Sequence, residues 1–138
     1  MEASPTPTVA RLARARRMEK EQTHFYRSLA AAAEAAGDAV ASERLNELHA
    51  DEQHHLSRLT ARILELGGEP EALPSPPVEE VISGWEARAR SREALEIAFY
   101  ETLLAEEVLD PGSRAVVEEI LASEAQHRTH LGGKWMSA

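Results

Sequence analysis

The sequence predicts an all-α protein: one bundle of four helices, built from two related helical hairpins. Three observations lead to this prediction. Alanine and glutamate are abundant, and aromatic residues make up only 4% of the 138 residues, a composition that favours helix. No segment alternates between apolar and polar residues with the period of two that a half-buried strand shows. The two halves of the chain also resemble each other in sequence, so one helical hairpin accounts for both.

Glycine and proline mark the limits of the predicted helices. Gly37 stands where the first helix ends, and Gly67 where the second ends, because glycine is the usual residue just beyond a helix. Asp110 and Pro111 predict the start of the fourth helix, an N-cap followed by proline at the first helical position. The resulting organisation is a flexible leader at 1–8, a bundle at 9–132 (hairpin 9–67, proline-rich linker 68–77, hairpin 78–132) and a tail at 133–138.

The sequence leaves two starts for the third helix, Val78 or, if Gly84 breaks the helix, a residue near Trp85. A start at Val78 leaves ten residues, 68–77, to connect the second and third helices. If these helices run parallel, the linker has to cover roughly 45 Å, whereas ten residues reach at most about 36 Å. Either the third helix starts late or the hairpins are exchanged between two subunits. We expect a homodimer, with or without this exchange.

The repeat is visible residue by residue. Residues 19–26 align with 93–100 at an offset of 74, and both segments run from a glutamate to Phe-Tyr. Residues 48–55 align with 120–127 at an offset of 72, and both carry Glu-x-x-His. The slip of two residues falls in the short turns, where deletions are tolerated. The chain is therefore predicted to be a duplication of one hairpin.

Each hairpin offers one glutamate on its first helix and a Glu-x-x-His on its second. Residues three apart on a helix point the same way, so each Glu-x-x-His can bind one ion with two side chains. These positions are in helical phase with the leucines, the two isoleucines and the valine of the predicted core. The set is Glu19, Glu52, His55, Glu93, Glu124 and His127.

Carboxylates in a core stripe indicate bound cations. Four buried glutamates would repel one another and lose their hydration unless they were protonated or bound to metal. Two divalent cations would balance four glutamates. The alternative is a polar cavity with paired or protonated acids. A third Glu-x-x-His, Glu21 and His24, lies off this stripe and predicts a solvated pair, as does His54, whereas His49 and His130 are expected at the boundary.

Composition excludes other classes of function. The formal net charge of −9 argues against nucleic acid or an anionic membrane as a partner. Without cysteine there is no disulfide, thiolate zinc site or iron–sulfur cluster. No apolar run approaches the ~20 residues that cross a bilayer, and residues 1–7 lack the apolar stretch of a secretory signal. The expected location is cytoplasmic.

The chemistry of the predicted ligands limits the choice of metal ion. A site rich in oxygen, with two imidazoles and no sulfur, suits iron or manganese better than copper or structural zinc. The residue types alone leave the choice between iron and manganese open.

The pattern Glu, Glu-x-x-His, Glu, Glu-x-x-His on four helices resembles that of the ferritin-like di-iron proteins. Within that superfamily the chain is most similar to the di-iron domain of rubrerythrins and erythrins. The 33 residues from Glu19 to Glu52 match that family, as does a tyrosine seven residues after the first ligand. That tyrosine is Tyr26, with Tyr100 as its repeat partner. The resemblance implies a ferritin-like bundle with two iron ions, and Tyr26 and Tyr100 as hydrogen-bond donors beside them.

Glu96 extends the resemblance. It follows Glu93 by three residues and its repeat partner is Gln22, whereas rubrerythrins carry an extra glutamate at this point. The implied ligand set therefore has seven members, although Glu96 as a half-buried helix residue is the alternative. The set is Glu19, Glu52, His55, Glu93, Glu96, Glu124 and His127.

The resemblance implies an oxidoreductase that reduces hydrogen peroxide, or oxygen, at the di-iron centre. The chain lacks the Cys-x-x-Cys domain of full rubrerythrins, so turnover requires an external electron donor. The first alternative is a ferroxidase that serves iron storage or detoxification. A di-iron hydroxylase and a non-enzymatic metal-binding bundle are the remaining alternatives.

Overall fold

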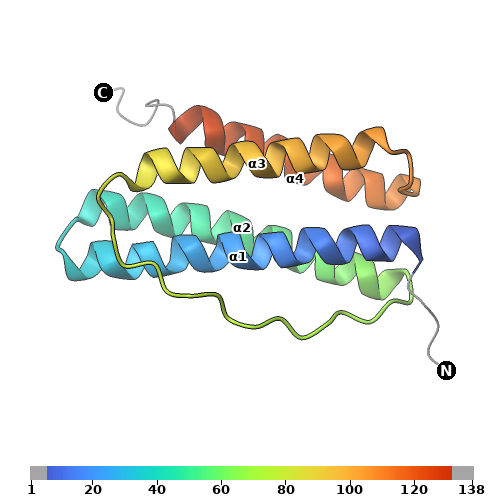
Figure 1. The fold of residues 1–138 in the computed structure, drawn as a ribbon, viewed down its shortest axis with the longest axis horizontal. Coiled ribbons are helices and arrows are strands. Elements are labelled where there is room, and N and C mark those ends of the chain that lie inside the picture. The colour runs from blue at the N-terminus through green and yellow to red at the C-terminus, as the bar shows by residue number, and fades with distance from the viewer. Residues whose placement is uncertain (1–5, 132–138) are drawn as a thin grey trace.

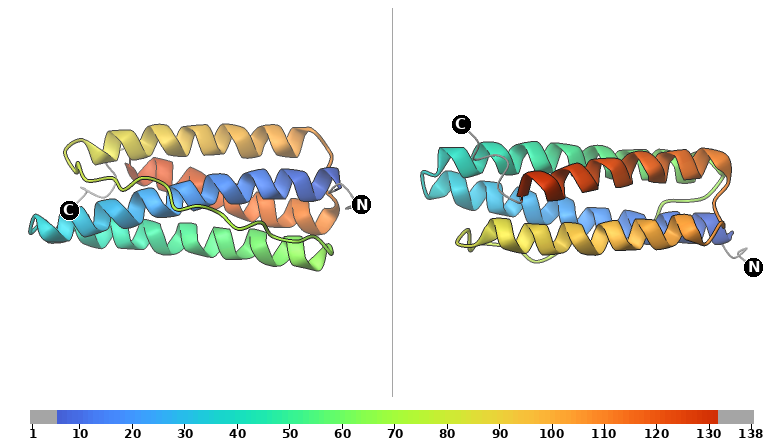
Figure 2. Two further views of the ribbon diagram at one scale, coloured as in Figure 1. Left: turned by 60° about the horizontal axis from the view of Figure 1, so that its bottom comes forward. Right: turned by 90° about the horizontal axis from the view of Figure 1, so that it is seen from above.

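A computed structural model describes residues 6–131 of the chain. They form four helices and no strand, in the order α1 (Pro7–Ala35), α2 (Ala39–Glu65), α3 (Trp85–Ala105) and α4 (Pro111–Leu131). The α1–α2 pair forms one layer and the α3–α4 pair the other, with all four helices running along the long axis (Figures 1 and 2). The predicted four-helix bundle of two hairpins is confirmed.

The helix limits follow from local chemistry. The Thr6 hydroxyl accepts a hydrogen bond from the Val9 N–H, and Asp38 does the same for Ala41. The capping predicted at Asp110 is also present, since its carboxylate accepts from the Ser113 N–H at the start of α4. Between α1 and α2, Gly37 has a φ of +75°, a left-handed conformation that favours glycine. The polar side chains accept hydrogen bonds from backbone N–H groups that the start of a helix leaves unpaired, and Gly37 lets the chain turn at the end of α1.

The crossover from α2 to α3 resolves the alternative left open by the sequence. Because α3 begins at Trp85 and not at Val78, residues 66–84 are available to connect the two helices. A chain of that length spans roughly 60 Å when extended, more than the path requires. Residues 66–84 run along the outside of α1 for most of the bundle (Figure 1). One chain can therefore complete the bundle without exchanging hairpins, and the homodimer stays a prediction.

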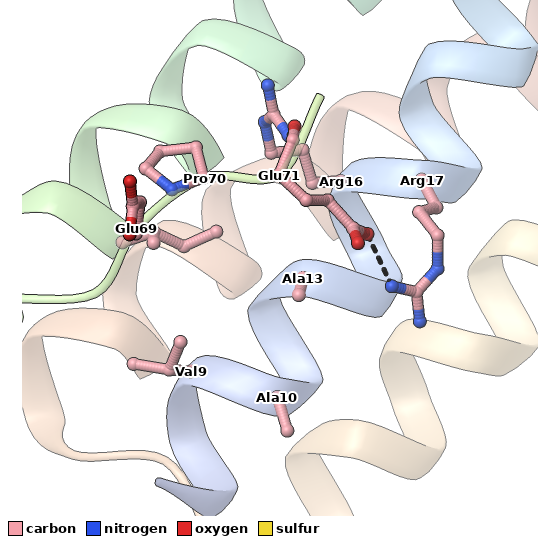
Figure 3. Close-up of a pocket in the computed structure, with 9 residues that line it drawn as sticks. Val9, Ala10, Ala13, Arg16, Arg17, Glu69, Pro70 and Glu71 are labelled. Atoms are coloured by element: carbon pink, nitrogen blue, oxygen red, sulfur yellow. Dashed lines mark hydrogen bonds and ion pairs between the residues drawn. The ribbon is translucent and has the colours of Figure 1, made fainter. Parts of the chain in front are cut away.

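Arginines of α1 hold the crossover in place. Arg16 donates to the Glu71 carbonyl oxygen (2.6 Å) and to the Thr60 hydroxyl (2.7 Å). Arg17 forms an ion pair with the Glu71 carboxylate at 2.6 Å, drawn as a dashed line in Figure 3. A cavity of about 240 Å³ lies at this junction, and none of the seven predicted ligands lines it. We interpret it as a packing space beneath the crossover.

The core consists of two apolar clusters with a polar layer between them. Along every helix, apolar residues precede and follow the glutamate that the sequence singled out. One cluster gathers the C-terminal half of α1, the first turns of α2 and α3, and the end of α4. Its members include Tyr26, Leu29, Leu45, Leu48 and Trp85. The other cluster, at the opposite end of the bundle, includes Leu12, Leu59, Leu103, Val117 and Ile120.

Several predictions about the chain ends fall outside the described residues. Residues 1–5 of the predicted leader are among them, as are residue 132, the last of the predicted bundle, and the tail at 133–138. Within 6–131, no helix combines the length and the apolarity that crossing a membrane requires.

Replacing Leu59 by alanine tests the core. Leu59 is fully buried, so the lost contacts and the cavity left behind should lower the free energy of unfolding by about 2–5 kcal/mol. Leu64→Ala on the same helix is the matched control, because Leu64 is 58% exposed and its loss should change stability by about 0.5 kcal/mol or less. Urea unfolding of the metal-free protein measures both. Equal losses would contradict this core assignment.

Candidate metal centre

The seven predicted ligands meet in the polar layer. Each helix contributes at least one of them, and none of the seven is more than 5% exposed. α1 provides Glu19, α2 provides Glu52 and His55, α3 provides Glu93 and Glu96, and α4 provides Glu124 and His127. The two hairpins thus present matching side chains to one another across the bundle axis.

Unpartnered polar atoms concentrate in this layer. Within residues 6–131, thirteen buried side-chain nitrogen and oxygen atoms have no hydrogen-bond partner, and ten of them belong to these seven residues. Both carboxylate oxygens of Glu52, Glu96 and Glu124 are among the ten, as are the Nδ1 atoms of both histidines. A buried polar atom without a partner is costly, so such a concentration of them indicates an absent ligand. Oxygen and imidazole nitrogen atoms that converge in this way suit a metal ion.

Six of the seven side chains form two overlapping groups. In each group, one ligand atom from every residue lies within 4.8 Å of all the others. Ligand atoms about 2.1 Å from one ion lie no more than roughly 4.2 Å apart, so modest movements would let each group close on an ion. The groups are Glu19, Glu52, His55 and Glu124, and Glu52, Glu93, Glu124 and His127.

Glu52 and Glu124 belong to both groups. They are therefore placed to bridge two ions, while each hairpin supplies one further glutamate and one histidine to its own position. Glu96 is in neither group, although it is 3% exposed and both of its oxygens lack partners. It lies beside the two groups, and its ligation stays a prediction.

The electrostatics of the layer reflect crowding of acids. Burial, followed by the charges of neighbouring glutamates, raises the pKa of Glu52 and Glu96 well above the usual range. Burial and Glu93 raise the pKa of Glu124 to about 8. For Glu19 and Glu93, burial also raises the pKa, but the contacts from histidine, tyrosine and a neighbouring acid outweigh it and lower the pKa overall. In the metal-free protein, protons therefore take the place of cations on part of the cluster.

The two histidines face the acids through Nδ1. As ion pairs that lack the geometry of hydrogen bonds, His55 Nδ1 lies 2.9 Å from Glu124 Oε1, and His127 Nδ1 lies 3.2 Å from Glu52 Oε1. Burial by itself lowers the pKa of an imidazole, but the surrounding carboxylates raise it, to about 9 for His55 and about 10 for His127. Protonated imidazoles are thus part of the metal-free state, and a metal ion has to displace these protons.

The two tyrosines bind across the hairpins. The Tyr26 hydroxyl donates to Glu93 Oε1 at 2.6 Å, and the Tyr100 hydroxyl donates to Glu19 Oε1 at 2.7 Å. Both tyrosines are fully buried, and burial raises their pKa well above the usual value, so they remain donors at neutral pH. Each one orients the first-helix glutamate of the other hairpin.

Three residues around the layer were missed by the sequence reasoning. Asp51 accepts a hydrogen bond from His127 Nε2 at 2.8 Å, and Gln22 donates to Glu93 Oε1 at 3.3 Å. Arg92 in turn donates to Gln22 Oε1 at 2.7 Å. A signal was available in the repeat, because all three differ in type from their counterparts in the other hairpin.

The remaining histidines lie outside both groups. His54 is exposed, as expected, and His49 and His130 are half-buried at the boundary. Glu21 is exposed but His24 is half-buried, which corrects the expected solvated pair. The reason is the crossover, since His24 lines a pocket together with Pro76 and Pro77.

Comparison with known proteins identifies the fold. No protein-family model and no curated protein matches the sequence. Among solved structures, the chain is similar to the bacterioferritin of Desulfovibrio desulfuricans, a protein with a diiron site, with a TM-score of 0.83 over 91% of this chain and 75% of that one. This chain has the ferritin-like fold. At 23% identity the likeness concerns the fold, which confirms the predicted ferritin-like bundle, while the rubrerythrin-type assignment stays a prediction.

The metal-free ferritin-like bundle should lose stability as pH rises from about 6.5 to 9. Glu124, His55 and His127 have pKa values of about 8, 9 and 10 in the folded chain, against ordinary values of 4.5 for glutamate and 6.5 for histidine. The folded state therefore holds more protons than the unfolded state in this range, and its stabilisation is lost as pH passes through the folded values. Thermal unfolding at several pH values, in the presence of a chelator, measures the effect. A melting temperature that rises over this range would contradict the assignment.

Replacing Glu52 by glutamine should reduce metal binding without unfolding the bundle. Glutamine has the shape of the protonated glutamate, and Glu52 belongs to both groups, so bound Co²⁺ should fall from two ions per chain to one or none. Equilibrium dialysis gives the stoichiometry, and circular dichroism checks the fold. Glu47→Gln is the control, since Glu47 is exposed on the same helix and should leave two ions bound. Two ions bound by the Glu52 variant with unchanged affinity would rule out the bridging position.

Proposed function

We propose that this chain binds two iron ions in the polar layer and oxidises ferrous iron with oxygen or peroxide, as a ferroxidase. The observation that carries the proposal is the convergence of ten unpartnered buried polar atoms on one layer of a ferritin-like bundle. The diiron site of the similar bacterioferritin supports iron as the metal and iron oxidation as the activity.

The donor set supports the choice of two iron ions. Carboxylate oxygen with imidazole suits iron, and two carboxylates shared between two groups suit a bridged pair. Five glutamates carry five negative charges against four positive charges on two ferrous ions. A site with excess negative charge stabilises the ferric state, so oxidation of the bound ions is favoured.

The residues around the ions determine what reaches them. Because the ligands are buried, only small molecules such as oxygen, peroxide and ferrous ions approach without a rearrangement of the helices. The hydroxyls of Tyr26 and Tyr100 hold Glu93 and Glu19 in place for the ions. Ferrous iron is the electron donor: two ions lose two electrons, which with two protons convert one peroxide to two waters, or one oxygen to one peroxide.

Glu96 favours a second candidate, a peroxidase of rubrerythrin type. A fifth buried carboxylate with two unpartnered oxygens lies next to the groups, and a shift of an ion toward it would accompany a change of oxidation state. In this case the iron is retained and re-reduced by an external donor, and peroxide is the substrate.

Anaerobic loading followed by rapid mixing separates the candidates. The protein is loaded with two ferrous ions per chain and mixed with oxygen or with peroxide in a stopped-flow spectrometer. A ferroxidase should oxidise both ions with either oxidant and continue to oxidise ferrous iron that is added afterwards. Oxidation at least tenfold faster with peroxide, and no turnover of further iron, would favour the peroxidase.

Glu47→Gln again serves as the control and should react like the wild-type chain, whereas Glu52→Gln should lose the rapid phase. The same titration with Mn²⁺ tests the metal. Failure to bind ferrous iron stoichiometrically would refute the proposed function.

A further inference from the structure

The repeat is nearly symmetric at the metal ligands but not around them. The six ligands that form the two groups and the two tyrosines match between the hairpins, whereas several neighbouring pairs differ in residue type. Three of the differing pairs contain the residues that make hydrogen bonds around the layer. These pairs are Met18 and Arg92, Gln22 and Glu96, and Asp51 and Ser123.

The first difference concerns the histidines. Asp51 accepts from His127 Nε2 at 2.8 Å, which fixes the ring orientation and leaves Nδ1 facing the cluster. In the repeat the counterpart of Asp51 is Ser123, a neutral residue, and among the described residues the contacts of His55 with acids are all made through Nδ1. Within residues 6–131, an acid outside the layer therefore holds His127, whereas His55 has no such contact.

The second difference concerns the first-helix glutamates. Tyr26 and Gln22 both donate to Glu93 Oε1. The Gln22 amide is itself oriented, because Arg92 donates to its oxygen at 2.7 Å, and the Arg92 guanidinium lies 4.4 Å from the centre of the Phe25 ring.

Glu19, by contrast, accepts from one side chain outside the ligand set among the described residues, Tyr100. At the position that corresponds to Gln22, the repeat has Glu96, a buried carboxylate that lies outside both groups. The Glu19 position is therefore less constrained than the Glu93 position.

We propose that the two metal positions fill in order, with the Glu93–His127 position first, and that Asp51 and Gln22 are the positioning residues that make it the tighter one. The inference rests on the proposed function only in requiring that the layer binds metal. Ligands already held in their binding orientation lose less freedom when an ion arrives, and outer hydrogen-bond partners of this kind contribute about 10- to 100-fold to metal affinity. Asp51 acts on His127 and Gln22 acts on Glu93, so both raise the affinity of the same metal position.

Titration of the metal-free full chain with Co²⁺, followed by visible absorption and calorimetry, tests the order. Two binding events are expected, the first about tenfold or more tighter than the second. His55→Ala should retain the tight event, and His127→Ala should retain only the weak one. Two events of equal affinity, or a tight event that depends on His55 and not on His127, would overturn the inference.

Variants of residues that are not ligands test the order of filling without removing a ligand. Asp51→Asn and Gln22→Leu should each weaken the first event by about tenfold or more and leave the second unchanged. Ser123→Asp should strengthen the second event, because it supplies the missing acid to His55. Circular dichroism of the metal-free variants checks the fold, and Glu47→Gln is the matched surface control. Unchanged affinities in all three variants would refute the role of these residues, whereas no Co²⁺ or ferrous binding by the wild-type chain would refute the proposed function itself.

Discussion

Five carboxylates and two imidazoles lie in the middle of a bundle whose ends are apolar, and the removal of these groups from water is the constraint on which the rest of the structure depends. Each buried group is unfavourable by itself, because desolvation and like charge both oppose ionisation. In the metal-free protein the elevated pKa values of Glu124, His55 and His127 show that protons offset part of this penalty. Two divalent ions would offset it more completely and would also give the unpartnered oxygens their ligands.

The apolar clusters on either side of the polar layer offset the free-energy cost of burying these groups. Leu59 and Ile120 at one end, and Leu29 and Leu48 at the other, are almost fully buried, so apolar packing stabilises the bundle on both sides of the layer. The crossover keeps both hairpins within one chain, and Arg16 and Arg17 hold it against α1. This packing on both sides of the layer holds the buried acids and imidazoles close together.

Duplication explains both the symmetry of the site and its departure from symmetry. Two copies of a hairpin that carries Glu and Glu-x-x-His place matching ligands across one axis, and Tyr26 and Tyr100 then reach the opposite copy. Once duplicated, the copies are free to differ. The chain retains the ligands in both halves but has different residues outside them, so that Glu93 and His127 are held more firmly than Glu19 and His55.

The sequence by itself determined the bundle, the duplication and the seven residues that meet at its centre. Helical periodicity and Glu-x-x-His spacing are local properties, and they place Glu52 and His55 on one face whatever the rest of the chain does. Only the tertiary structure decided that Glu52 and Glu124 are shared between two groups and that Glu96 lies outside both. It also decided that α3 starts at Trp85. These outcomes depend on how far each side chain reaches across the axis between helices, a distance that helix packing sets and that no periodicity within one helix encodes.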